Sequence, residues 1–273
     1  MLRRNLMLAL ALALAGCSTF SPDNPPRVRL ATTTSTYNSG LLQELLPPFE
    51  ESTGIRVQVL AVGTGQALAL GERGEVDLVL VHARRREDEF IKQGHGMERR
   101  DMMWNDFVIL GPPQDPAGLR GGKDAPAALA RLKDKRARFV SRADDSGTHI
   151  RELALWEEAG GVPVGETFYL EAGQGMGNCL TLADEKEAYI LADRGTYVAF
   201  SSHLDLEVMV EGDPALRNPY GVMLINPRRH PHVQFAAARK LLDYFTSAAV
   251  QRRIEEFRVA GEALFHPAAQ MSP

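Results

Sequence analysis

The sequence predicts an α/β protein built from two lobes. Short apolar runs rich in β-branched residues alternate with stretches in which apolar residues recur at helical spacing, an order typical of βαβ units with parallel strands. Several of the apolar runs end in loops rich in glycine, serine and threonine. The chain has 273 residues, of which 44% are hydrophobic and 24% charged, and this length suffices for one large domain or two lobes.

The N-terminal part is expected to precede the fold. Two arginines stand before an apolar run at 6–15, which is too short to span a bilayer and is typical of an export signal. The run ends in Leu-Ala-Gly-Cys, similar to the bacterial lipobox, so residues 1–17 are expected to form a lipoprotein signal peptide and Cys17 to carry the lipid. A plain signal peptide is the alternative. Residues 18–27, with three prolines, are expected to be a tether. If Cys17 is lipidated, only Cys179 remains and no intramolecular disulfide is expected.

The first lobe is expected to begin with three strands, each followed by a helix. These strands are predicted at 28–31, 55–60 and 77–82. The third is a continuous apolar run, which indicates burial on both faces of a parallel sheet. Apolar residues at helical spacing predict a helix over 41–49, although Pro47 and Pro48 would disturb its end.

The chain is expected to cross between the lobes twice. A strand at 106–111 is closed by two prolines, and a strand at 219–225 leads back. The elements expected between them lie at 129–133, 150–159 and 166–170, in a helix that follows the loop at 171–177 and runs through 183, and at 188–199. One long helix is predicted at 233–257. Lobe I would then comprise 28–110 and 219–273, and lobe II 111–218.

Four loops at ends of predicted strands together contain hydroxyls, glycine N–H groups and a single arginine. They lie at 32–36, 63–66, 142–148 and 173–177. In open α/β sheets, ligands bind beyond the carboxyl ends of the strands, so two facing lobes would place all four loops around one cleft. Such a cleft is suited to an anion held mainly by neutral dipoles.

One of these loops carries most of the signal. Arg142 supplies a fixed charge, and Ser146, Gly147 and Thr148 stand where a following helix begins, so together they can hold an anion against free N–H groups. Asp144 can orient the guanidinium from behind. The alternative interpretation is structural: an Arg142–Asp144 pair that fastens a helix start, with hydroxyls that cap helices.

The order of these motifs resembles the substrate-binding protein of the bacterial ABC uptake system for tungstate. The lipobox carries this resemblance together with six segments, at 31–36, 63–67, 77–83, 141–149, 173–177 and 188–197. The resemblance spans about residues 28–265. It implies a type II periplasmic-binding-protein fold, with two α/β lobes, a ligand cleft and a hinge of two crossovers. It also implies a membrane permease as partner and a location outside the cytoplasm, anchored by the lipid.

The resemblance also implies roles for individual residues. Arg142 and Thr148 would contact the oxyanion directly, beside Ser146 and the N–H of Gly147. Lobe I would complete the shell, and Asp144 and His82 would support it from behind. The residues expected from lobe I are Thr33, Thr34, Ser35 and Thr64.

The identity of the oxyanion stays partly open. The motif around Arg142 also resembles that of phosphate-binding proteins, in which a carboxylate accepts the proton that phosphate carries. His82 stands at the comparable strand end here, which favours a fully deprotonated dianion such as tungstate or molybdate. Sulfate is deprotonated too, and the preference for tungstate over molybdate comes from the resemblance alone.

Other classes of function are disfavoured. Ser146, His149 and Asp144 contain the residue types of a hydrolase triad, but they crowd within one helix start and lack the Gly-x-Ser-x-Gly elbow. The seven histidines show no metal-binding spacing. The formal net charge of -4 indicates no nucleic-acid partner. We expect a monomer that is not an enzyme and that requires no cofactor and no metal cation.

Overall fold

The computed structural model describes residues 25–259 and 261–268. The predicted signal peptide, Cys17 with its lipid and residues 18–24 of the predicted tether therefore lie outside the described residues. Within the described ranges, no helix has both the length and the apolar character that crossing a membrane requires.

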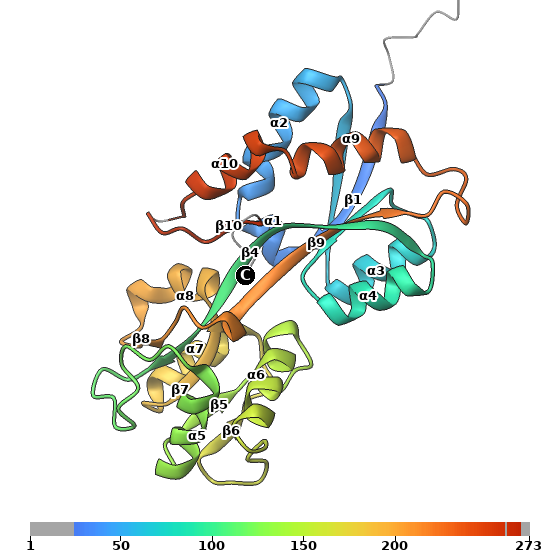
Figure 1. Ribbon diagram of the computed structural model, residues 1–273. Helices are drawn as coiled ribbons and strands as arrows, with labels where there is room; N and C mark the ends of the chain where they lie inside the picture. The colour runs from blue at the N-terminus through green and yellow to red at the C-terminus, as the bar shows by residue number, and fades with distance from the viewer. Residues whose placement is uncertain (1–24, 260, 269–273) are drawn as a thin grey trace, which may run out of the picture.

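The molecule consists of two α/β lobes joined by two long strands (Figure 1). In lobe I, β1 (Arg27–Thr33) pairs in parallel with β2 (Arg56–Val62) on one side and with β3 (Leu78–Val81) on the other. The side chains of β3 are fully buried, as its continuous apolar run predicted. The α/β class with parallel strands is thus confirmed.

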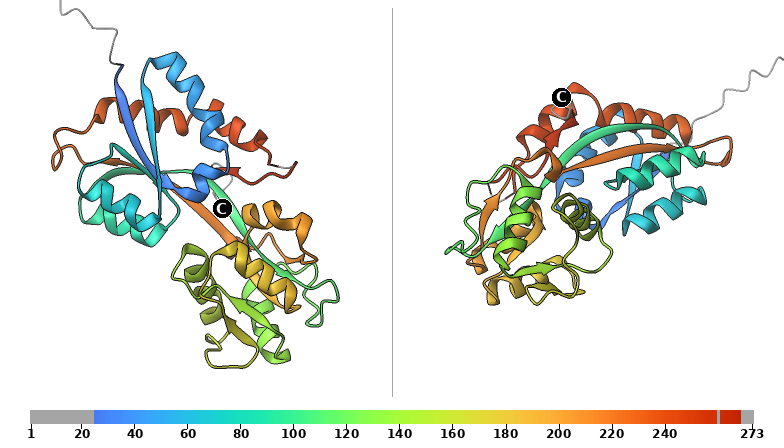
Figure 2. Two further views of the ribbon diagram at one scale, coloured as in Figure 1. Left: turned by 180° about the vertical axis from the view of Figure 1, so that it is seen from behind. Right: turned by 60° about the horizontal axis from the view of Figure 1, so that its bottom comes forward.

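Helices cover both faces of the lobe I sheet. The helices of this lobe are α1 (Thr34–Asn38), α2 (Leu41–Thr53), α3 (Thr64–Glu72), α4 (Arg84–Lys92), α9 (Phe235–Phe245) and α10 (Ala248–Glu256). The apolar residues of α2, α9 and α10 form one core with the sheet, and those of α3 and α4 form another on the opposite face (Figures 1 and 2). The sheet is therefore protected on both sides, as a parallel sheet requires.

Two expectations about helices were wrong. The helix at 41–49 continues through both prolines to Thr53, because the buried Leu45 and Phe49 hold its apolar face against the core and tertiary packing outweighs local propensity. The predicted helix at 233–257 is two helices, α9 and α10. It breaks where Ser247 caps α10 by accepting a hydrogen bond from the N–H of Val250.

Lobe II contains a second, smaller sheet. Here β5 (Phe139–Ser141) pairs in parallel with β6 (Tyr169–Glu171) and with β7 (Tyr189–Asp193). The remaining elements are α5 (Ala125–Lys135), α6 (Gly147–Glu158), α7 (Met176–Glu185), α8 (Arg194–Phe200), β8 (Glu207–Val210), and the short 3-10 helices η1 (Ser201–His203) and η2 (Pro214–Leu216). Like lobe I, this lobe has a buried apolar core on each face of its sheet.

Two strands connect the lobes. Strand β4 (Gly96–Gly111) pairs antiparallel with β9 (Arg217–Ile225) in lobe I and then with β7 and β8 in lobe II. In Figure 1 both strands run diagonally from one lobe to the other. Strand β4 is ten residues longer at its start than the predicted strand at 106–111, and β10 (His266–Pro267) pairs with it as well. The division of the chain into lobes at 110 and 219 remains a proposal.

Candidate functional site

The lobe I loops lie at the carboxyl ends of its parallel strands. Thr33 is the last residue of β1 and caps α1: its Oγ1 accepts a hydrogen bond of 3.2 Å from the N–H of Thr36. The same oxygen lies 2.6 Å from the Oγ1 of Thr36 and 3.1 Å from the Oγ of Ser35. Thr33 and Thr36 are buried, whereas Thr34 and Ser35 are exposed. This loop therefore holds a connected cluster of hydroxyls.

The second lobe I loop begins α3. Gly63 precedes this helix in an extended conformation, and Thr64 is its first residue. A Cβ atom at Gly65 would lie 3.1 Å from the Nη2 of Arg86, so a guanidinium from the first turn of α4 lies beside this loop. The sequence alone does not indicate this contact, because only the fold brings α4 next to α3.

His82 lies between the two hinge strands and the loop that follows β1. Its Nδ1 is 3.2 Å from the Nδ2 of Asn218, and its Nε2 is 3.4 Å from the Oγ1 of Thr33. The ring stacks on Tyr220, with centroids 4.6 Å apart. Burial lowers the pKa of His82, although the charge of Asp193 acts in the opposite direction. His82 is thus neutral near pH 7.

The loop that follows β5 holds the charge of lobe II. The Nη2 of Arg142 forms an ion pair of 2.9 Å with Asp144, and its Nη1 lies 3.4 Å from the Oγ1 of Thr148. Its Nε is buried without a hydrogen-bond partner among the described residues. Arg142 is therefore held in place by Asp144, a pair that both the anion-site and the structural interpretation expect, while part of its donor capacity is unused.

The start of α6 adds backbone donors to this charge. Ser146 caps the helix: its Oγ accepts from the N–H of His149 at 3.3 Å. Gly147 and Thr148 are the first two helical residues, where N–H groups have no intrahelical carbonyl to pair with. The N-terminus of a helix of this length, with a guanidinium beside it, attracts anions.

The backbone of this loop is strained. Ala143 and Asp145 have φ angles of 46° and 55°, in the left-handed region that favours glycine. Ala143 therefore keeps this conformation without the residue best suited to it. Loops hold such angles only where their surroundings enforce them.

Glu152 helps to hold this loop in its strained conformation, and it was not identified from the sequence. Its carboxylate accepts from the backbone N–H of Arg142 at 3.2 Å and from the hydroxyl of Tyr169 at 2.8 Å. It is almost fully buried, and this burial raises the pKa of the Glu152 carboxyl. The only signal in the sequence is that an acidic residue stands on the apolar side of a predicted helix.

The fourth predicted loop, at 173–177, begins α7. Gly173 has a φ of 62°, and Gly175 precedes the helix in an extended conformation. Cys179 is buried on α7 and is near enough to Arg142 for the guanidinium to influence its thiol. The start of α7 thus lies on the same side of lobe II as the charged loop.

The two sets of loops meet across the lobes. A Cβ atom at Gly147 of lobe II would lie 3.9 Å from the Cε1 of His82 of lobe I. Val198 of α8 packs against the core of lobe I. The structure thereby brings the Thr33–His82 cluster of lobe I close to the Arg142–Thr148 loop of lobe II.

The residues of the hydrolase alternative are engaged in other contacts. The Oγ of Ser146 accepts from the backbone of His149, and the Nδ1 of His149 accepts from the backbone N–H of Asp145 at 3.1 Å. A Ser–His pair in which the ring withdraws the hydroxyl proton is therefore not formed between them within the described chain.

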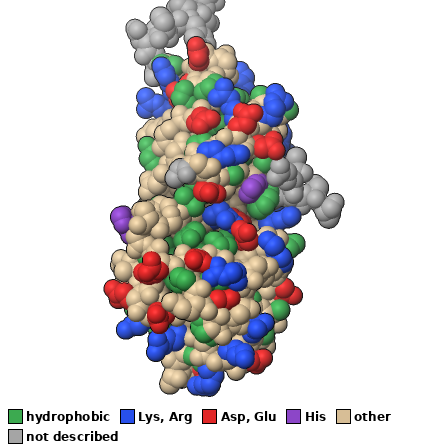
Figure 3. Space-filling view, turned by 90° about the vertical axis from the view of Figure 1, so that its left-hand side faces the viewer, with side chains coloured by type: hydrophobic (Ala, Val, Ile, Leu, Met, Phe, Trp, Pro, Cys, Tyr) green, Lys and Arg blue, Asp and Glu red, His purple; other side chains and the backbone are tan. Residues whose placement is uncertain are grey.

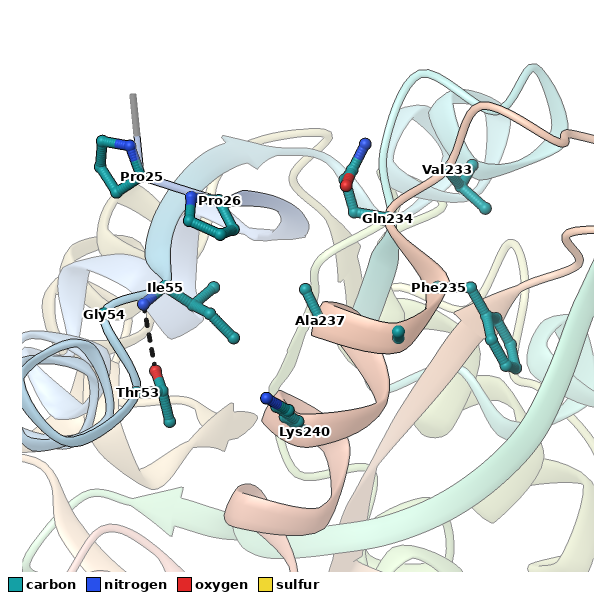
Figure 4. Close-up of a pocket in the computed structure, with 11 residues that line it drawn as sticks. Pro25, Pro26, Thr53, Gly54, Ile55, Val233, Gln234, Phe235, Ala237 and Lys240 are labelled. Carbon is teal, nitrogen blue, oxygen red and sulfur yellow. Dashed lines mark hydrogen bonds between the residues drawn. The ribbon is translucent and has the colours of Figure 1, made fainter. Parts of the chain in front are cut away.

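A large pocket lies elsewhere and has a different character. Its volume is about 790 Å³, and it opens between the start of β2 and the start of α9 (Figure 4). Its walls are mostly apolar, with Ile55 and Phe235 among them and Lys240 as the one charged side chain of the lining. Apolar walls do not compensate the desolvation of a small dianion, so this pocket is a poor candidate for the anion site.

On the face shown in Figure 3, basic and acidic side chains are interspersed and form no single-sign patch. No group of three or more His, Cys, Asp or Glu side chains suited to a metal ion occurs among the described residues.

Comparisons with known proteins agree with this geometry. Residues 21–249 match the family described as a PBP superfamily domain. The chain is 44% identical to the tungstate-binding protein TupA of Peptoclostridium acidaminophilum, covering 96% of both chains. It is similar to the solved tungstate-binding protein of Desulfovibrio alaskensis G20, with a TM-score of 0.86, 43% identity, and 89% and 98% of the two chains covered. The crystal structure of the tungstate ABC transporter from Geobacter sulfurreducens matches with a TM-score of 0.74, 52% identity, and coverage of 85% and 98%.

Proposed function

Because the chain belongs to the periplasmic-binding-protein superfamily and, within it, to the tungstate-binding proteins of ABC transporters, we propose that it captures tungstate between its lobes. It is the substrate-binding component of such a transporter. In the proposed mechanism the dianion bridges both lobes and stabilises the closed arrangement, which the membrane permease then recognises. The protein would bind and release its substrate unchanged and would not act as an enzyme.

One observation carries the proposed site: the Gly147 end of α6 lies against His82 across the lobes. An oxyanion held there would accept hydrogen bonds from Arg142, Thr148 and the first N–H groups of α6. From the other lobe it would meet the hydroxyls of the loop after β1. The predicted shell from lobe I, namely Thr33, Thr34, Ser35 and Thr64, belongs to this proposal.

The chemistry of the site supports a fully deprotonated oxyanion. The side chains proposed to face the ion donate hydrogen bonds, and the ion pair with Arg142 occupies the Asp144 carboxylate. Phosphate carries a proton near neutral pH and leaves that proton unpaired where an acceptor is missing. Molybdate and sulfate fit the same donor set. Exclusion of the smaller sulfate depends on cavity size, whereas the preference for tungstate over molybdate rests on the family.

The cellular setting is proposed along with the ligand. The protein would act on the outer side of the cytoplasmic membrane as a monomer, tethered by a lipid on Cys17. The similarity to extracytoplasmic binding proteins supports the compartment, and the lipobox sequence supports the anchor.

The test is a calorimetric titration of the purified full chain with tungstate, molybdate, sulfate and phosphate in parallel. We expect saturable binding of tungstate at one ion per chain and no heat from phosphate. Tight binding of phosphate with no response to tungstate would overturn the assignment.

A further inference from the structure

The hinge strands carry a buried pair of amides next to the cleft. Asn105 of β4 and Asn218 of β9 stand opposite each other in the strand register, and both are at least nine-tenths buried. Strands β4 and β9 connect the lobes, so this pair lies where the chain passes from one lobe to the other. Buried amides need partners for their donors and acceptors.

The hydrogen bonds of this pair run in one direction. The Nδ2 of Asn218 donates to the Oδ1 of Asn105 at 2.8 Å, and the Nδ2 of Asn105 donates to the hydroxyl of Tyr220 at 3.1 Å. The second hydrogen of the Asn218 amide points to the Nδ1 of His82 at 3.2 Å. An amide nitrogen only donates, so Nδ1 accepts and the single hydrogen of the neutral imidazole is on Nε2.

The position of that hydrogen decides what the lobe I wall presents to an anion. The Nε2 of His82 lies 3.4 Å from the Oγ1 of Thr33, which also accepts from the N–H of Thr36. With both lone pairs of this oxygen directed to donors, the hydroxyl hydrogen of Thr33 is left to donate, to the ligand or to the hydroxyls of Thr36 and Ser35, which lie 2.6 and 3.1 Å away. With the hydrogen on Nδ1 instead, Nε2 would be an acceptor, and it would compete with the ligand for that hydroxyl hydrogen.

The environment of the ring supports the neutral form. The groups around His82 are Tyr220, stacked beneath it, Asn218 and Thr33 at its two nitrogens, and Asp193, whose charge acts on the ring. A second proton on Nδ1 would face the amide hydrogens of Asn218, so the imidazolium would place two donors against each other.

We propose that Asn218 is a positioning residue, which fixes His82 in the tautomer with its hydrogen on Nε2 and so directs the donors of lobe I towards the bound oxyanion. This inference rests on the proposed function, because it assigns a role at the same cleft. The proposal also identifies a determinant of specificity. With its hydrogen on Nε2, His82 makes the lobe I wall a donor of hydrogen bonds, which suits a fully deprotonated ion and offers no acceptor to protonated phosphate.

The tautomer is measured directly by NMR on the full chain labelled with ¹⁵N at histidine, using the His82→Gln variant to assign the ring signals. We expect Nε2 of His82 to resonate as a protonated nitrogen and Nδ1 as an unprotonated one near neutral pH, without any ligand. A protonated Nδ1 would overturn the proposal. Because this measurement needs no tungstate, it stays informative even if the proposed function fails.

The positioning role is tested by making the same substitution in two proteins, the wild-type chain and the His82→Gln variant. Asn218→Leu is expected to weaken tungstate binding by about five- to tenfold, in line with one hydrogen bond of roughly 1 kcal/mol. In a His82→Gln background, where the side-chain amide has no tautomer to set, the same change is expected to weaken binding less than about twofold. Equal losses in both backgrounds would contradict the proposal.

The control is Asn226→Leu at the far end of β9, where Asn226 donates to the carbonyl of Gly94 at 2.8 Å. This variant removes a comparable amide hydrogen bond away from the cleft and is expected to leave tungstate affinity unchanged. If Asn226→Leu weakens binding as much as Asn218→Leu does, the effect belongs to the strand and not to His82.

Discussion

The wall of the proposed cleft formed by lobe II is charged and strained, whereas the part of the lobe I wall formed by His82 and the loop after β1 consists of hydroxyls and a neutral imidazole. Arg142 and the start of α6 attract any small anion, because charge and helix dipole act without regard to its protonation. Thr33 and His82 are directional donors fixed by buried neighbours. We infer that lobe II provides most of the affinity and lobe I most of the selectivity.

The largest effect is expected for Arg142→Ala. Losing charge-assisted hydrogen bonds of about 1.5–3 kcal/mol should weaken tungstate binding at least tenfold and weaken molybdate binding equally. Arg138→Ala is the control, since Arg138 is in the same lobe and donates to the carbonyl of Lys186. If a calorimetric titration of Arg142→Ala showed unchanged affinity, the arginine would only stabilise the start of the helix, and lobe II would not provide most of the affinity.

A smaller and more selective effect is expected for Thr33→Val. This change removes one hydroxyl from the lobe I wall at nearly constant volume and should weaken tungstate binding by about five- to tenfold. The neighbouring Thr32→Val is the matched control, because Thr32 donates to the carbonyl of Leu80 within the sheet, at 2.9 Å. That variant should lower the free energy of unfolding and leave affinity unchanged. Equal binding losses in the two variants would argue against a ligand-facing role for Thr33.

The neutral imidazole predicts a pH dependence of stability. The pKa of His82 is lowered in the folded protein, so the unfolded chain takes up a proton first as pH falls through about 6.5. The free energy of unfolding should therefore decrease between about pH 7.5 and 5.5. His82→Gln should reduce this slope in urea denaturation. His266 also has a lowered pKa, so the His266→Gln variant measures how much His266 contributes to the same pH dependence. An unchanged slope in His82→Gln would contradict a buried neutral ring.

The smallest effect is expected for Ala143→Gly in the strained loop. Glycine relieves the left-handed φ of 46° and should raise the free energy of unfolding by about 0.5–1 kcal/mol. Ala127→Gly in α5 is the contrasting control and should lower it by a similar amount. Destabilisation by Ala143→Gly would show that the loop is held by neighbours that do not depend on this residue's conformation.

The local part of this architecture was readable from the sequence. The run of hydroxyl residues around Thr33 and the glycine-rich turn at Thr64 can be recognised at strand ends, and Ser146 stands where a capping residue belongs. The first ten residues of β4 could not be predicted as a strand, because the charged stretch at 98–101 interrupts the apolar pattern of the strand. Their structure depends on β9, more than a hundred residues away, and β propensity is decided by such partners.

The same reason limits what the sequence says about the site. The contact of His82 with Asn218 and the proximity of Arg86 to Gly65 exist only because separate βα units pack side by side. Polar residues such as Asn105 within apolar strands are the remaining signal, and their partners follow only from the register of β4 and β9.

The pairing of β3 with β9 has a consequence for the order of folding. Lobe II is built from one continuous stretch of chain between β4 and β9, whereas the sheet of lobe I lacks the strand that lies between β3 and β4 until β9 is present. As the chain emerges from its N-terminus, β3 has an open edge while lobe II can already assemble. The lobe that begins first is thus the last to be completed, because β9, α9 and α10 all follow lobe II in the chain.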